Sequence, residues 1–138
     1  MAYLELLPAP CPLRLTGFSA EDRDWVARAL ERLRQACPQM YVHVFTALVE
    51  IRPATPTDPC RANSTGCTKN DRVARLRMDK LRADPDETLL TIAHEALHYQ
   101  WSIFGWLYVT HLEPLNVATD RIYRDETVLR EMIKTVAH

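Results

Sequence analysis

The sequence predicts an α+β fold in which three helices and a small β-sheet share one core. Three observations favour this fold class. Apolar residues recur at helical spacing near both ends of the chain, β-branched residues cluster in two stretches between them, and a proline-rich segment separates those two stretches. The 138 residues, of which 47% are hydrophobic, suffice to bury one core. We therefore expect a single domain over 1–138, with 1–18 as an N-terminal extension.

The first predicted element is a helix that begins after Ser19. Serine is a favourable N-cap, Asp22 suits the positive end of the helix dipole, and Pro38 ends the helix. The apolar residues of its buried face are Trp25, Val26, Ala29, Leu30, Leu33 and Ala36. Residues 41–51 follow; they are rich in β-branched and aromatic side chains and predict a buried strand.

A loop and a second strand are predicted next. Residues 52–70 hold three prolines and many small polar residues, which is typical of a loop. Residues 72–78 predict a strand in which Ala74 and Leu76 face one side of the sheet and Arg75 faces the other.

The next helix has the clearest start in the chain. Asp84 can cap it, Pro85 suits its first position, and Glu87 stands at the capping-box position. We expect this helix to run from Pro85 to about Trp101, and residues 102–113 to form an aromatic-rich connection.

A final helix is predicted from Pro114 nearly to His138. Its apolar stripe consists of Leu115, Ile122, Leu129, Ile133 and Val136. Glu126 falls within this stripe, four residues after Ile122 and three before Leu129. Burying a carboxylate there without a compensating cation is costly, so Glu126 is a candidate metal ligand.

Charge and composition argue against several partners and locations. The formal net charge of −1 gives no bulk attraction to nucleic acid, and no apolar run is long enough to span a bilayer, so we predict neither a nucleic-acid nor a membrane partner. The N-terminus lacks the pattern of a secretion signal, which favours a cytoplasmic location. Disulfides would instead favour a secreted protein. Cys60 and Cys67 bracket a short loop that a disulfide could close, and Cys11 and Cys37 are the remaining cysteines.

The most informative feature is the run His94-Glu95-Ala96-Leu97-His98. Residues four apart lie on one face of a helix, so His94 and His98 can both give a nitrogen lone pair to one Zn²⁺. Glu95 lies about 100° around the helix from His94, where it can reach a metal-bound water without ligating the metal. The pattern predicts metal-assisted hydrolysis of an amide.

The third ligand is chosen from the acids and histidines that follow the motif. The apolar stripe favours Glu126, whereas Asp120 points about 120° away from it on the final helix. His111, Glu113 and Asp120 stay open as alternatives. A salt bridge from Glu126 to Arg130 is the interpretation that needs no metal.

The order of elements and the motif together resemble the zincin metallopeptidases, and among them the gluzincin-like group of minigluzincin and SprT-like domains. The resemblance covers about residue 19 to the C-terminus, and only the five-residue motif is specific. It implies zinc bound by His94, His98 and a glutamate of the last helix, Glu95 as general base, and substrate paired with the strand 72–78. The metzincin branch is excluded, since Trp101 and Phe104 stand where that branch has glycine and histidine.

We therefore expect a zinc-dependent metallopeptidase, an endopeptidase rather than an exopeptidase, that acts on peptide or protein substrates. Tyr123 is the expected donor to the oxyanion of the tetrahedral intermediate, with His111 and Tyr108 as alternatives. Two other classes stay open. One is a zincin-fold regulatory or binding domain with little proteolysis. The other is a metal-free α/β interaction module that binds a partner through Trp101, Phe104, Trp106 and Tyr108.

Overall fold

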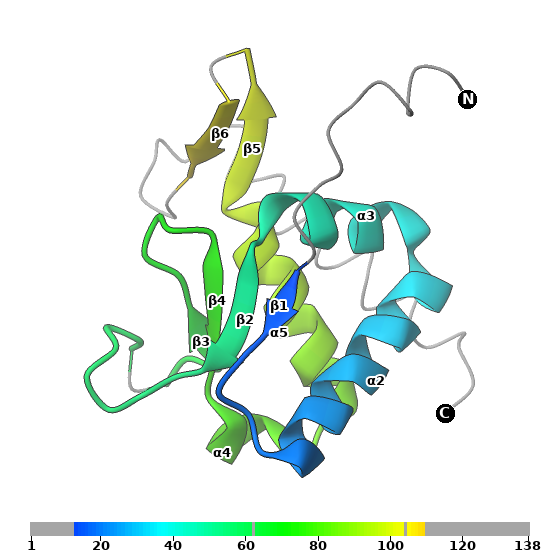
Figure 1. Cartoon of the computed structure of the whole chain (residues 1–138), viewed down its shortest axis with the longest axis vertical. Helices are drawn as coiled ribbons and strands as arrows, with labels where there is room; N and C mark the ends of the chain where they lie inside the picture. Colours follow the sequence, from blue (N-terminus) through cyan, green and yellow to red (C-terminus); the bar gives the residue numbers. More distant parts are fainter. Residues whose placement is uncertain (1–12, 62, 104, 110–138) are drawn as a thin grey trace.

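A computed structural model describes residues 13–61, 63–103 and 105–109, and these residues form an α+β fold (Figure 1). The expected fold class is confirmed at this level. The elements in chain order are β1 (Arg14–Leu15), α2 (Ala20–Ala36), α3 (Pro38–Ala47), β2 (Glu50–Pro53), β3 (Gly66–Cys67), β4 (Val73–Leu76), α4 (Met78–Leu81), α5 (Pro85–Leu97), β5 (Tyr99–Ser102) and β6 (Gly105–Tyr108). Among them, no helix is long and apolar enough to cross a membrane.

The two predicted helix starts are confirmed by their caps. The Ser19 hydroxyl accepts a hydrogen bond from the Asp22 backbone N–H at the start of α2. The Asp84 carboxylate accepts from the backbone N–H groups of Asp86 and Glu87, and Pro85 is the first residue of α5. Each cap satisfies donors that the first helical turn leaves without an intrahelical partner.

Helices α2, α3 and α5 pack on one another, and α5 also contacts β3 and β4. Leu33, Val44 and Ile92 are fully buried where the three helices meet. A hydrogen bond from Trp25 Nε1 to Thr88 Oγ1 (2.9 Å) joins α2 to the first half of α5. Burial of these apolar side chains fixes α5, the helix that carries the His-Glu-His motif, within the core.

The main sheet has the strand order β1-β2-β4-β3. β1, β2 and β4 run parallel, and β3 joins the outer side of β4 antiparallel, with Gly66 opposite Leu76. β4 therefore has a neighbour on both sides, and all four of its residues are buried, including Arg75. The strand over 72–78 was expected to pair with substrate, but β3 occupies its outer side at Arg75 and Leu76, so these two residues offer no open edge. β3 is the edge strand on that side.

The predicted strand over 41–51 is also wrong. Most of this stretch is helix α3, which Pro38 opens at its first position. Met40, Val44 and Ala47 are buried at helical spacing against the other helices, whereas Val42 is 59% exposed. Packing along this one helical face outweighs the weak strand preference of β-branched residues. The strand itself begins only at Glu50 and ends at Pro53.

Three further boundaries differ from the prediction. α5 ends at Leu97 rather than near Trp101, and the following residues form the antiparallel hairpin β5–β6, not an irregular connection. β4 covers 73–76 only, and Met78 begins the short helix α4. β1, which lies in the segment expected to be an N-terminal extension, pairs with β2 as a strand of the main sheet. The predicted final helix, 114–138, lies outside the described residues.

Candidate metal centre

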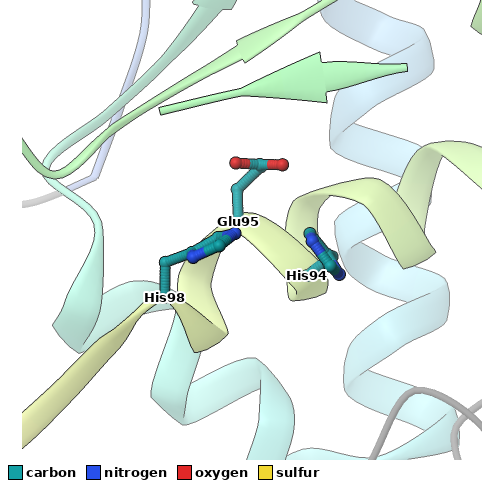
Figure 2. A group of neighbouring side chains, drawn as sticks. All are labelled: His94, Glu95 and His98. Atoms are coloured by element: carbon teal, nitrogen blue, oxygen red, sulfur yellow. The ribbon is translucent and has the colours of Figure 1, made fainter. Parts of the chain in front are cut away.

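The three motif residues converge at the C-terminal end of α5. Their potential ligand atoms, one from each of His94, Glu95 and His98, all lie within 4.8 Å of one another. The two imidazole rings are 5.1 Å apart, centroid to centroid, at an interplanar angle of 81°. Figure 2 shows the side chains together, with the Glu95 carboxylate directed toward the strands. Glu95 and His98 are each only 5% exposed, so both polar groups are almost completely removed from bulk water.

The orientation of His98 is fixed by the residue that follows the hairpin. His98 Nδ1 lies 2.5 Å from the Val109 carbonyl oxygen, and the Val109 N–H donates back to the His98 carbonyl at 2.6 Å. Since a carbonyl oxygen can only accept, Nδ1 carries the proton and Nε2 is the nitrogen with the lone pair. Metal-binding histidines commonly show this arrangement, in which the second ring nitrogen donates to a carbonyl.

Tyr108, at the end of β6, packs against the imidazole ring of His98. Its ring stacks on the His98 ring at 5.6 Å and 18°. Burial raises the pKa of the Tyr108 phenol above its ordinary value of 10, and the nearby ionisable groups of Tyr99 and Glu95 act in the same direction. The phenol is therefore protonated at neutral pH and can donate a hydrogen bond.

A second histidine outside the motif supports the end of α5. His43 Nε2, in α3, donates to the Ala96 carbonyl at 2.9 Å, and its ring meets the Trp106 ring edge-on at 6.0 Å. Carbonyls in the last turn of a helix lack the usual i+4 donor, so this bond gives the carbonyl of a motif residue a partner from another helix. Sequence reasoning missed His43 because it placed the residue in a strand.

A cavity of about 470 Å³ opens beside the motif. It is lined by His94, Glu95 and His98 from the motif, by Tyr108 from β6, and by residues 63–68 from β3 and the segments beside it. The cavity therefore has a buried carboxylate and two imidazoles beside the backbone of β3.

The wall that contains β3 approaches α5 unusually closely. A Cβ atom on Gly66 would lie 2.8 Å from both the Arg75 carbonyl oxygen and Thr91 Cγ2, so only glycine fits there without displacement. The adjacent Thr65 and Thr91 hydroxyls are hydrogen bonded at 2.7 Å. These contacts hold the edge strand one helical turn before Glu95.

Charges and a disulfide hold the loop before β3. Asp58 accepts from the Thr55 backbone N–H at 2.7 Å and lies 3.3 Å from both Lys69 Nζ and Arg75 Nε. Arg75 forms a bidentate pair with Asp71 on its other side, at 2.6 and 3.2 Å. The hydrogen bond from the Thr55 backbone is the largest cause that lowers the pKa of Asp58 to about 2, against the opposing effect of burial.

A disulfide joins Cys60 to Cys67, with their Cα atoms 5.2 Å apart, and closes the loop that the sequence suggested. Cys37 has a free thiol, and Cys11 lies outside the described residues.

The structure thus brings together the three motif residues and Tyr108. Glu126 and Tyr123 lie outside the described residues, as do His111, Glu113 and Asp120, so these assignments stay predictions. The supporting contacts of Val109 and His43 were missed. Aromatic residues at every second position, Tyr99 and Trp101 before Gly105 and Trp106 and Tyr108 after it, are the sequence signal that could have predicted the hairpin and hence the return of Val109 to His98.

Comparison with protein-family models, with curated proteins and with solved structures finds no match for the chain.

Proposed function

We propose that the protein is a zinc-dependent metallopeptidase with a gluzincin-like, minimal zincin domain. The observation that carries the proposal is the convergence of two imidazoles and one buried carboxylate within 4.8 Å, on the wall of a cavity. Imidazole nitrogens are preferred zinc ligands, and the hydrogen bond to Val109 directs the lone pair of His98 to Nε2. The donor set therefore fits zinc.

The zinc ligands in this proposal are His94 and His98, with Glu126 as the third. When bound, zinc supplies Lewis-acid polarisation of the peptide carbonyl and lowers the pKa of a water molecule. Glu95 accepts the proton of the attacking water and returns it to the leaving amine. Tyr123 is the donor to the developing oxyanion predicted from the sequence. Tyr108 is the alternative that lines the cavity, and its hydroxyl, which donates to the Thr68 carbonyl at 3.4 Å, would have to turn from that carbonyl to the oxyanion.

Substrate binding is assigned to the edge strand β3. Gly66 lies opposite Leu76 in an antiparallel pair, and the Arg77 N–H donates to the Thr65 carbonyl at 2.8 Å. In such a ladder the groups of alternate residues point outward, so the N–H and C=O of Gly66 face the open edge. An extended peptide that adds to this edge lies over the cavity beside Glu95.

The decisive test is Glu95→Gln, measured for both zinc content and peptide hydrolysis. We expect one zinc ion per chain to be retained and kcat to fall about 10²-fold or more, since an amide cannot serve as general base. Glu87→Gln is the matched control, because Glu87 lies on the same helix and lines the same cavity two turns earlier. It is expected to keep both zinc and activity.

The outcomes also separate the other two classes. Zinc binding without hydrolysis of a broad peptide library would favour a regulatory or binding domain. Failure to bind zinc in the wild type would favour a metal-free interaction module. Undiminished hydrolysis by the Glu95→Gln variant would refute the mechanism.

A further inference from the structure

The end of the β5–β6 hairpin exposes large apolar side chains on both of its faces and at its turn. Within the described residues, large hydrophobic side chains that are exposed occur at four positions, and three of them lie here: Trp101 (70% exposed), Ile103 (94%) and Leu107 (46%). The fourth, Val42, lies on α3. In Figure 1 the hairpin projects from the end of α5, with its turn directed away from the helices. Exposing this apolar surface to water is unfavourable in free energy, and a binding partner or a lipid phase that covers it would remove this penalty.

The register shows how these side chains are distributed. Trp101 pairs with Trp106, and Gln100 pairs with Leu107. Opposed residues of an antiparallel pair share a face, so Trp101 and Leu107 point to opposite faces, with Ile103 at the turn between them. A single helix or a flat protein surface would cover only one face. Apolar side chains on both faces and at the turn instead suit an apolar environment that surrounds the whole end of the hairpin.

The distribution of charged residues in and beside the hairpin favours a lipid interface as this environment. Residues 96–110 contain no Asp, Glu, Lys or Arg, so the hairpin would carry no charged side chain of its own into the lipid. The Ser102 hydroxyl donates to the Gly105 carbonyl at 3.0 Å, which pairs a polar group within the turn itself. Arg72 lies at the base of the hairpin, with its guanidinium 5.2 Å above the Trp106 ring. An apolar tip, tryptophans behind it and a cation at its base match successive layers of a lipid interface.

We propose that the β5–β6 hairpin is a monotopic membrane anchor whose tip inserts into the headgroup–acyl boundary of a phospholipid bilayer. This insertion differs from a transmembrane span and does not depend on net charge, the two grounds on which the sequence predicted no membrane partner. The open backbone edges of a two-stranded hairpin limit insertion to the interface, at a depth of about 5–10 Å. The inference goes beyond the proposed peptidase function and requires no metal.

The test is sedimentation of the full chain with phosphatidylcholine vesicles. The wild type is expected to bind, with little weakening when the salt concentration is raised, because the contact is apolar. Ile103→Ser is the primary variant, since this side chain is almost fully exposed and its loss leaves the fold intact. We expect its partition coefficient to fall about tenfold. Trp101→Ser is expected to have a similar effect.

Val42→Ser is the matched control, because it removes an exposed apolar side chain outside the hairpin. It should bind vesicles like the wild type, within about twofold. The proposal is overturned if the wild type does not sediment with vesicles, or if Val42→Ser weakens binding as much as Ile103→Ser. A third outcome also overturns it: the wild type does not bind vesicles but self-associates, and Ile103→Ser abolishes this self-association. A second copy of the chain would then be what covers the hairpin. The zinc content of each variant is measured separately, so this result is independent of the metallopeptidase proposal.

Discussion

The two walls of the cavity are held in place by different forces. The α5 wall rests on the hydrophobic core: Leu89, Ile92 and Ala96 are fully buried beneath the motif. The other wall, formed by the loop before β3 and by β3 itself, contacts α5 at Thr65 and Gly66 and is held in addition by an ion-pair network around Asp58 and Arg75 and by one disulfide. Apolar burial is insensitive to protonation and to thiol reduction, whereas the second kind of support is sensitive to both.

This difference has a functional consequence. Among the residues that the structure describes, those proposed to bind zinc and accept a proton (His94, His98 and Glu95) lie on the wall that the core fixes, and the residues proposed to bind substrate lie on the other. Changes of pH or of redox conditions should therefore disturb substrate binding before they disturb the metal centre. Three perturbations of decreasing size test this separation.

The largest effect is expected from Ile92→Ala, which opens a cavity beneath α5. Ile92 is fully buried, and truncation of such a side chain costs about 2–5 kcal/mol of unfolding free energy. Because His94 and Glu95 belong to this helix and His98 follows directly after it, zinc affinity and activity should decline together with stability. Chemical denaturation and zinc titration measure the two effects. Val42→Ala, an exposed position on α3, is the control and should change stability by less than about 0.5 kcal/mol. Loss of stability with unchanged zinc affinity would contradict the dependence of the centre on the core.

A smaller and more selective effect is expected from opening the disulfide in the variant with both Cys60→Ser and Cys67→Ser. A closed loop of this length contributes about 2.5 kcal/mol in the chain-entropy model. Since Cys67 belongs to β3 and lines the cavity, we expect KM for a peptide to rise while zinc content stays unchanged. Denaturation midpoints, KM and metal analysis check this. Cys37→Ser, which removes a free thiol, should leave all three as in the wild type. A loss of zinc in the double variant would show that the two walls are not independent.

Sequence reasoning succeeded where local geometry determines the structure. The caps at Ser19 and Asp84 depend on neighbours within three residues, and the approach of His94 to His98 follows from helical spacing alone. These features require no knowledge of what packs against them, so the sequence sufficed for both helix starts and for the motif.

Sequence reasoning failed where contacts between residues distant in the sequence determine the structure. Residues 41–47 form a helix because Val44 and Ala47 find a core there, against their own strand preference. The sequence does not show that β3 joins the sheet at the edge next to β4. The need for glycine at position 66 becomes clear only when the close contact with Thr91 is known. The same holds for the pairs His43–Ala96 and His98–Val109, since turns and registers that no local pattern specifies bring them together.

The smallest effect concerns pH and the Asp58 carboxylate. Its pKa is about 2 in the folded protein and about 3.9 in an unfolded chain. A depressed pKa contributes stability that is fully present above the unfolded value and is lost as pH falls through the folded value, so the loss lies between about pH 4 and pH 2. Because Asp58 is nearly buried, we expect up to about 2 kcal/mol from this group.

The measurement is the unfolding free energy of the wild type and of Asp58→Asn across that pH range. The variant lacks the ionisable carboxylate, so its stability should fall less steeply between pH 4 and pH 2, and it should be the less stable protein at pH 7. Asp24→Asn, which removes an exposed carboxylate paired only with Arg28 on the surface of α2, serves as the control and should follow the wild-type profile. Parallel profiles for the wild type and the Asp58 variant would mean that the second wall owes its position to the disulfide and to packing, and not to this buried charge.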